Sequence, residues 1–223
     1  MGKNSGHGRW YGDACGTAFA MELVGERWSL LIVRELLLDA RRFSDLRAAL
    51  GAISAKTLTE RLESLLAAGV VLRRELPAPG KAQVYELTRW GYAAEPLIQE
   101  AGRWAAQSSA HDPTLPLSPV ALMISLRTMV DKSCLRRVKG RIGIAVGEDT
   151  FIAEAGKGEL AVRRAEAEEA DVVFRAPNAS LLAALFYRKV PASDLAASGL
   201  EIKGDIALAK RFVDLFALPP KLS

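Results

Sequence analysis

Hydrogen-bonding side chains are concentrated in one short segment of the N-terminal half. Hydroxyl, ammonium and guanidinium groups of this kind can reach base edges in the major groove of DNA. The residues are Ser54, Lys56, Thr57, Thr59 and Arg61. Leu58, Leu62 and Leu65 fall on one stripe of a helix, and Lys56 and Thr57 lie on its opposite side. The spacing therefore predicts a polar face near the start of a helix, where base contacts are normally made.

Basic side chains accompany this helix. Eight basic and four acidic residues lie between Arg41 and Lys81, and Arg42 belongs to the basic set. Arg73, Arg74 and Lys81 stand in or beside a hairpin, from which they could reach phosphates or the minor groove. An exposed charged edge that blocks aggregation would use the same residues. For these three residues, DNA contact is the favoured interpretation. For the basic stretch as a whole, charge alone favours a solvated face with ordinary arginine content, whereas the order of the elements favours DNA.

The elements that position these groups follow the order of a winged helix-turn-helix. A helix over residues 44–50 should end at Gly51, and Ser54 should cap the second helix, which Gly69 closes. Residues 70–76 and 82–87 have strand composition around the turn sequence PAPG. Residues 15–25 and 28–38 are expected to form helices, the second one buried. A helix over 88–107 should kink or break near Pro96.

The second half begins after a segment rich in proline and polar residues. We expect a flexible tail at 1–11, a winged-helix DNA-binding domain at 12–108, a linker at 109–118 and a second domain at 119–223. Ser118 should cap a helix there, followed by the strand-like runs RIGIAV, TFIAEA, ELAVRRA and DVVFRA, which suggest an antiparallel meander. Ser180 and Asp205 should then begin two helices. The fold class is α+β, with helices covering one face of a small sheet.

Composition limits the classes of protein that fit. The chain has 223 residues, of which 50% are hydrophobic, and no apolar run long enough to span a bilayer. Its first residues do not resemble a secretory signal, and two cysteines do not make a disulfide framework, so we expect a cytoplasmic protein with no membrane partner. The two histidines, His7 and His111, lie in contexts unsuited to acid–base work. No catalytic, metal-binding or dinucleotide motif appears, so we expect neither an enzyme nor a cofactor or metal.

Several of these pieces together resemble the HxlR-type winged-helix transcriptional regulators over about residues 12–108. The matching residues are Cys15, Gly25 to Trp28, Arg42-Phe43, Leu46, Ile53-Ser54, Leu58-Thr59, Arg61-Leu62, Leu87-Thr88 and Gly91. The resemblance implies a homodimer on an inverted-repeat operator in double-stranded DNA, with the terminal helices forming the dimer contact. It also implies that residues 54–61 form the recognition helix and that Arg73, Arg74 and Lys81 belong to the wing.

Cys15 is a candidate redox sensor. In some proteins of the family that the chain resembles, a cysteine near this position senses electrophiles or oxidants. A reactive thiol needs a lowered pKa, whereas Asp13, expected to cap the helix, would raise it by repulsion. A small, partly buried apolar role is the alternative for Cys15. Cys134, among Arg136, Arg137 and Lys139, is a weaker candidate.

The second half resembles the sterol-carrier-protein type of lipid-binding domain, on the segments DVVFRAPNASLLAALF and GLEIKGDIALAKRFVDLF. That resemblance implies a pocket for a small apolar ligand, and its candidate lining is Phe186, Leu208, Phe212 and Phe216. The same residues would equally suit a filled core, and periodicity cannot separate the two. The sequence thus predicts a dimeric transcriptional regulator, more often a repressor in such families, that senses an apolar ligand. The alternative is a lipid carrier whose N-terminal half only mediates dimerisation.

Overall fold

The computed structural model describes residues 11–76 and 82–222. They form two compact units, one ending at Ile98 and the other beginning at Gln99. The division falls inside helix α6 (Glu95–Ala106). The functional boundary expected at residues 109–118 remains a prediction. No described helix is both long and apolar enough to cross a bilayer.

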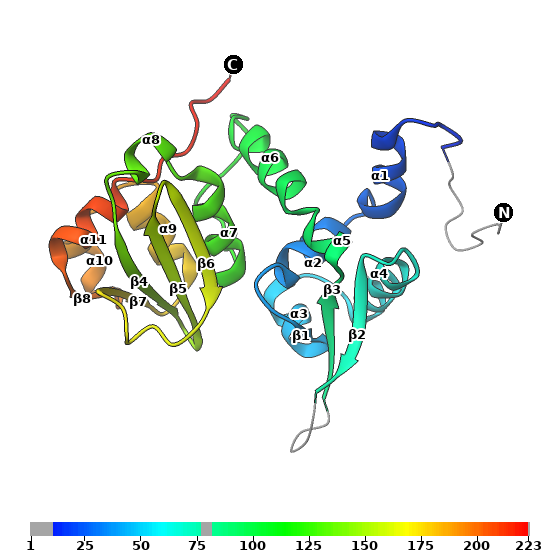
Figure 1. The fold of residues 1–223 in the computed structure, drawn as a ribbon, viewed down its shortest axis with the longest axis horizontal. Helices are drawn as coiled ribbons and strands as arrows, with labels where there is room; N and C mark the ends of the chain where they lie inside the picture. Colours follow the sequence, from blue (N-terminus) through cyan, green and yellow to red (C-terminus); the bar gives the residue numbers. More distant parts are fainter. Residues whose placement is uncertain (1–10, 77–81, 223) are drawn as a thin grey trace. The chain divides into compact units, whose positions relative to one another are not determined.

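The described part of the first unit begins with four helices, which pack with a small sheet (Figure 1). The helices are α1 (Gly16–Val24), α2 (Ser29–Leu36), α3 (Phe43–Leu50) and α4 (Ala55–Ala67). Gly51 ends α3 with φ +58°, a left-handed conformation that glycine adopts without strain. The core of this unit contains Ile32 and Leu36 of α2, both fully buried, as expected for a central helix.

The wing is a three-stranded antiparallel sheet. Its strands are β1 (Arg41–Arg42), β2 (Val71–Glu75) and β3 (Gln83–Leu87), in the order β1-β3-β2. The two-residue β1 was not expected, since its sequence has no alternation to identify it. After β3 the expected single helix is two, α5 (Arg89–Tyr92) and α6, with the break just before Pro96. Proline fits the first turn of α6, where its missing N–H needs no partner.

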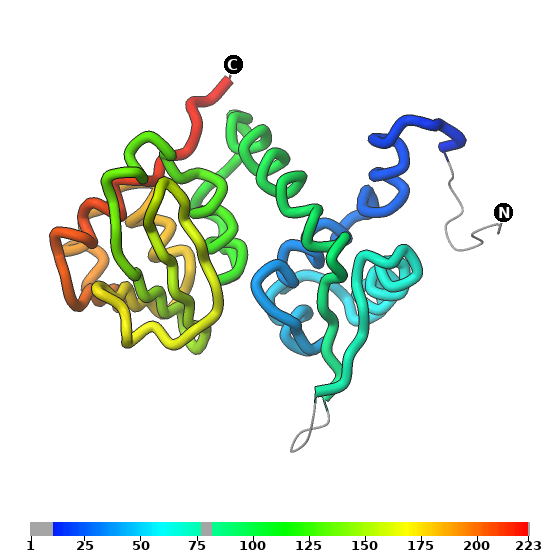
Figure 2. The backbone as a smooth tube through the Cα atoms, in the orientation of Figure 1, coloured from blue at the N-terminus to red at the C-terminus, as the bar shows by residue number. Residues whose placement is uncertain are grey.

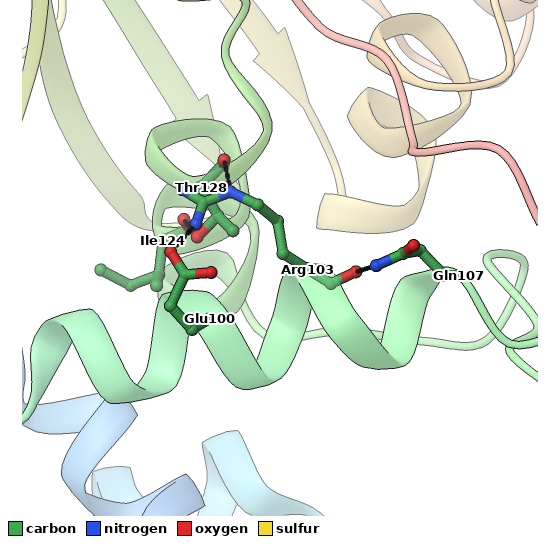
Figure 3. A network of polar contacts seen from close by, with 5 residues as sticks. All are labelled: Glu100, Arg103, Gln107, Ile124 and Thr128. Atoms are coloured by element: carbon green, nitrogen blue, oxygen red, sulfur yellow. Dashed lines mark hydrogen bonds and ion pairs between the residues drawn. The ribbon is translucent and has the colours of Figure 1, made fainter.

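The second unit holds the end of α6 through a polar network (Figure 3). Arg103 Nε donates to the carbonyl oxygen of Thr128 at 3.1 Å, and the guanidinium also pairs with Glu100. Thr128 Oγ1 in turn donates to the carbonyl of Ile124 at 2.7 Å. At the C-terminal end of α6, Lys221 Nζ donates to three backbone carbonyl oxygens, 2.9–3.2 Å away. Cations at helix ends of this kind satisfy carbonyl groups that have no partner within the helix.

The centre of the second unit is a five-stranded sheet in the order β6-β5-β4-β7-β8. The strands are β4 (Gly140–Val146), β5 (Asp149–Gly156), β6 (Glu159–Arg164), β7 (Val172–Ala176) and β8 (Glu201–Gly204). The first three form the expected antiparallel meander. The expectation that β7 continues it is wrong, because β7 pairs with β4 in parallel. The edge strand β8 was not expected.

The parallel pairing requires the chain to cross the sheet between β6 and β7. Residues 165–171 make this crossing, which Figure 2 traces in yellow. A β-carbon on Gly143 of β4 would lie 2.3 Å from the carbonyl oxygen of Ala167. Glycine at position 143 therefore lets the crossing segment lie directly on the strand.

Helices cover the sheet from the side opposite this crossing (Figure 1). They are α7 (Pro119–Met129), α9 (Ala179–Phe186) and α11 (Ile206–Val213). The unit also contains two shorter helices, α8 (Lys132–Leu135), at one end of the sheet, and α10 (Ala192–Ala196). Ser118 and Asp205 cap α7 and α11 as expected, each accepting from a backbone N–H. The cap of α9 is Asn178 rather than Ser180, because the helix begins two residues earlier. The predicted α+β class, with a winged helix-turn-helix first, is confirmed.

Candidate nucleic-acid interface

Helix α4 is fixed at its start by a side-chain cap. Ser54 Oγ accepts from the backbone N–H of Thr57 at 3.0 Å and bonds to Thr57 Oγ1 at 2.8 Å. Leu58, Leu62 and Leu65 are buried, at 0–1% exposure, so one face of the helix is anchored in the core. The opposite face at its N-terminal end is consequently left towards solvent.

That exposed face carries Lys56 and Thr59, with Thr57 half-buried beside them. Thr59 Oγ1 donates to the backbone carbonyl of Ala55 at 3.0 Å, which uses its hydrogen but leaves the oxygen able to accept. The ammonium group of Lys56 makes no ion pair among the residues that the structure describes. Together these groups offer donors and acceptors suited to base edges and phosphates.

Arg61 lies apart from this face. Its Nη2 is 3.4 Å from Glu26 Oε2, and its side chain is only 20% exposed. The segment between α1 and α2 therefore holds the guanidinium that the sequence assigned to DNA. A DNA contact by Arg61 would require this ion pair to break.

The wing arginines have different partners. Arg74 Nε lies 2.8 Å from Glu86 Oε2 across the β2–β3 pair, so its charge is balanced within the sheet. Arg73 stands opposite Tyr85, is exposed, and has no ion pair among the described residues. Lys81 lies outside the described residues. Of the two described wing arginines, Arg73 is the one free to meet a phosphate.

Helix α3 contributes two further basic side chains. Arg42 is the exposed residue before α3, and its backbone N–H donates to Asp45 Oδ2 at 3.3 Å. Arg47 is also exposed on α3, although the candidate site did not include it. The sequence offered it as one of the eight basic residues between Arg41 and Lys81, but its position three residues before buried Leu50 placed it at the margin of the buried face.

Cys15 is the exposed residue that immediately precedes α1. The backbone N–H groups of Thr17 and Ala18 lower the pKa of its thiol, and the hydroxyl of Thr17 acts in the same direction. The net shift is therefore a lowered pKa, opposite to the rise that the sequence expected from Asp13. Asp13 Oδ1 accepts from the backbone N–H of Cys15 at 2.9 Å, so its carboxylate is occupied by the backbone.

The candidate pocket residues of the second unit form an aromatic cluster. Phe186, Phe212 and Phe216 are fully buried, together with Phe174 of β7. Their ring centroids lie 4.9–6.1 Å apart, mostly in tilted or edge-to-face arrangements. Leu208 is buried against the start of β4, near Gly140. The three phenylalanines thus occupy the space that they would line in an open pocket.

Comparisons with known proteins agree with this arrangement. The HxlR-like helix-turn-helix family matches residues 23–113, and the SCP-2 sterol transfer family matches residues 125–217. The uncharacterized HTH-type transcriptional regulator YvaP of Bacillus subtilis is 39% identical over 88 residues, which are 40% of this chain and 82% of that protein. YodB of the same organism, also an HTH-type transcriptional regulator, is 36% identical over 88 residues, 40% of this chain and 79% of YodB.

Among solved structures, the reduced form of YodB is 33% identical and covers 45% of this chain and 100% of its own, with a TM-score of 0.41. The order of elements in the first unit is that of a winged helix-turn-helix, and its sequence relatives YvaP and YodB are HTH-type transcriptional regulators. The chain belongs to the HxlR-like helix-turn-helix family of transcriptional regulators, and its C-terminal residues 125–217 match the SCP-2 sterol transfer family.

Proposed function

We propose that the protein is a dimeric repressor that binds an inverted repeat and releases it when its C-terminal domain takes up an apolar ligand. The observation that carries the DNA-binding part is the exposed N-terminal face of α4. Its core-facing leucines fix the helix, while Lys56 and Thr59 remain free to enter a major groove. Arg42 and Arg73 are exposed on neighbouring elements and would contact phosphates.

Helix α1 supports the dimer. Its sequence, GTAFAMELV, is mostly apolar, yet Val24 is its one buried residue. Phe19 and Met21 are 45% and 41% exposed. A second copy of the chain would cover this apolar surface, and two-fold symmetry would then place two recognition helices on two half-sites.

The ligand-binding part rests on the SCP-2 match and on the aromatic cluster. Since Phe186, Phe212 and Phe216 touch one another, an apolar ligand would enter by separating these rings. Such repacking would move α11 and the C-terminal segment, whose Lys221 caps the end of α6. Ligand binding could then alter DNA affinity through a change in α6.

Cys15 offers a second input of the same kind. Its exposed, lowered-pKa thiol meets the requirement for reaction with oxidants or electrophiles. Modification at the start of α1 would disturb the surface that we assign to the dimer. Loss of the dimer would separate the half-site contacts and weaken DNA binding.

The experiment is a footprint of the purified protein on DNA upstream of its own gene, across a salt series. We expect a protected inverted repeat whose affinity falls steeply with salt, because phosphate contacts release counterions. The variant Lys56→Ala should no longer protect the repeat, whereas Lys203→Ala, a change in the second unit, should protect it as the wild type does. Diffuse binding without a protected repeat would overturn the proposal and leave lipid binding as the leading function.

The ligand is tested on the same complex. Oleate and cholesterol, added separately, probe an acyl chain and a sterol, and release of the operator by either one supports the sensing role. Binding of a probe without any change in operator affinity would mean that the C-terminal domain carries lipid without controlling DNA binding.

A further inference from the structure

A cluster of basic side chains lies at one end of the C-terminal sheet, far along the sequence from the winged helix. We call it the α8 patch; its members are Lys132, Arg136, Arg137, Lys139 and Lys157. All five are exposed, and none forms an ion pair within the described part of the chain. The lack of internal partners distinguishes them from the other arginines of the sheet, Arg141, Arg163, Arg164 and Arg175, which all pair with carboxylates.

The fold brings these residues together from two segments. Lys132 and Arg136 are one helical turn apart, and Lys139 leads from α8 into β4. The β5–β6 turn, Lys157-Gly158, meets α8 directly, because a β-carbon on Gly158 would lie 3.3 Å from Arg136 Cγ. Figure 1 shows α8 at the same end of the sheet as this turn.

Lys157 occupies a position that a lysine adopts only with strain. The turn joins the paired residues Gly156 and Glu159, and both of its residues have positive φ, +54° for Lys157 and +80° for Gly158. This is the geometry of a type I′ turn, in which asparagine or glycine is preferred at the first position. A strained residue that contributes a charge to an unpaired basic cluster points to a use for that charge.

Charge is also segregated within this unit. Residues 99–223 contain 17 basic and 15 acidic residues, so without the α8 patch the remaining 12 basic residues face 15 acidic ones. Two acidic side chains beside the patch accept hydrogen bonds from the backbone and pair with none of its cations, and Glu159, which follows the turn, also forms no ion pair among the described residues. Asp131 caps α8 by accepting from Ser133 and Cys134, and Asp171 accepts from the backbone N–H of Arg141 at 2.7 Å. The patch therefore presents a positive surface on a unit that is otherwise slightly acidic.

We propose that the α8 patch binds the phosphate backbone of duplex DNA outside the base pairs that the winged helix recognises. A polyanion is the partner because the five groups are cationic hydrogen-bond donors on segments that hold no exposed large apolar side chain. None of the exposed large apolar side chains among the described residues falls between 131 and 163, whereas a membrane-binding surface needs such side chains beside its cations. This inference rests on the proposed DNA-binding function and extends it to the second unit.

The test compares two duplexes in the full-length protein. One ends at the edges of the protected repeat, and the other extends about two helical turns, roughly 20 base pairs, beyond each edge. The double variant Arg136→Gln/Arg137→Gln should bind the long duplex about tenfold more weakly. The slope of log K against log salt concentration should become less steep by about 1 to 2, because one or two phosphate contacts are lost. Its affinity for the short duplex should not change.

A matched control removes the same charge elsewhere. Lys210→Gln/Arg211→Gln neutralises two exposed cations of α11 and should leave both duplexes unaffected. If both double variants lost the same affinity for the long duplex, the loss would be explained by net charge alone, and the proposal would be overturned. Failure of the wild-type protein to bind the short duplex would instead refute the proposed DNA-binding function itself.

Lys157 provides a variant whose two effects have opposite signs. Lys157→Asn places a preferred residue in the turn, so it should raise the melting temperature while it weakens binding to the long duplex. A more stable protein with unchanged affinity would show that the lysine serves the hairpin alone and would overturn the proposal. Binding of the patch to phosphatidylserine vesicles, with unchanged affinity for DNA, would overturn it in favour of a membrane surface.

Discussion

Arg73 and Arg74 are adjacent in the sequence but differ in their electrostatic surroundings. Successive residues of a strand point to opposite faces, and only Arg74 meets a carboxylate, that of Glu86. An arginine already paired gains little by contacting a phosphate, because it must give up its carboxylate. The two positions therefore test which face of the wing meets DNA.

We predict that Arg73→Gln weakens operator binding about tenfold and reduces the salt slope by about 1, as loss of one phosphate contact requires. Arg74→Gln should change operator affinity by less than about threefold, because its charge is balanced by Glu86. Titrations at several salt concentrations measure both. The assignment of the wing faces is wrong if Arg74→Gln has the larger effect.

The thiol of Cys15 should react as a more acidic cysteine than usual. Backbone N–H groups of Thr17 and Ala18 stabilise the thiolate, so alkylation by iodoacetamide should reach half its maximal rate below the ordinary cysteine pKa of about 8.5. Cys134→Ser removes the other cysteine, and the pH profile of the single-cysteine protein gives the result. A midpoint at or above the ordinary value would contradict the thiolate assignment.

At the scale of elements, α1 is mostly apolar in sequence, yet Val24 is its one buried residue. Apolar composition of this kind is expected of a buried helix. We predict that Phe19→Glu places a charge in the dimer contact and raises the dimer dissociation constant at least about tenfold, equivalent to about 1.4 kcal/mol. Sedimentation across a concentration series measures it. Leu115→Glu, which changes an exposed apolar residue outside α1, is the control and should leave the dimer intact.

Local signals located most of the elements, whereas the connections between strands depended on long-range packing. Caps at Ser54, Ser118 and Asp205 and the glycines after α3 and α4 act within a few residues, so the sequence predicts them. The parallel pairing of β7 with β4 depends on the segment that lies on Gly143. That glycine was visible in the sequence, but a glycine within a strand pattern indicates close approach without naming the partner.

At the scale of the whole molecule, the aromatic cluster gives the second unit its own core. We predict that Phe216→Ala, which empties a fully buried position, destabilises this unit by about 3–5 kcal/mol. Thermal unfolding should then show two transitions, with the lower one belonging to the second unit. Winged-helix binding to the short operator duplex should persist between them.

Ile206 supplies the control for this core substitution. Its side chain is 62% exposed, so Ile206→Ala should change the unfolding free energy by about 0.5 kcal/mol or less. If Phe216→Ala instead unfolded in a single cooperative transition, with loss of operator binding at the same temperature, the prediction that the two units unfold separately would be wrong.

The sequence by itself determined the family, the α+β class, the caps at Ser54, Ser118 and Asp205 and the polar face of α4, because these depend on residue types at short spacing. Tertiary structure decided which of the predicted site residues are available. Arg61 meets Glu26 and Arg74 meets Glu86, and the three phenylalanines of the candidate pocket meet one another. It also gathered the α8 patch from α8 and a hairpin some twenty residues later along the chain. Charge and hydrophobicity are properties of a residue, whereas pairing and packing depend on what the fold places beside it.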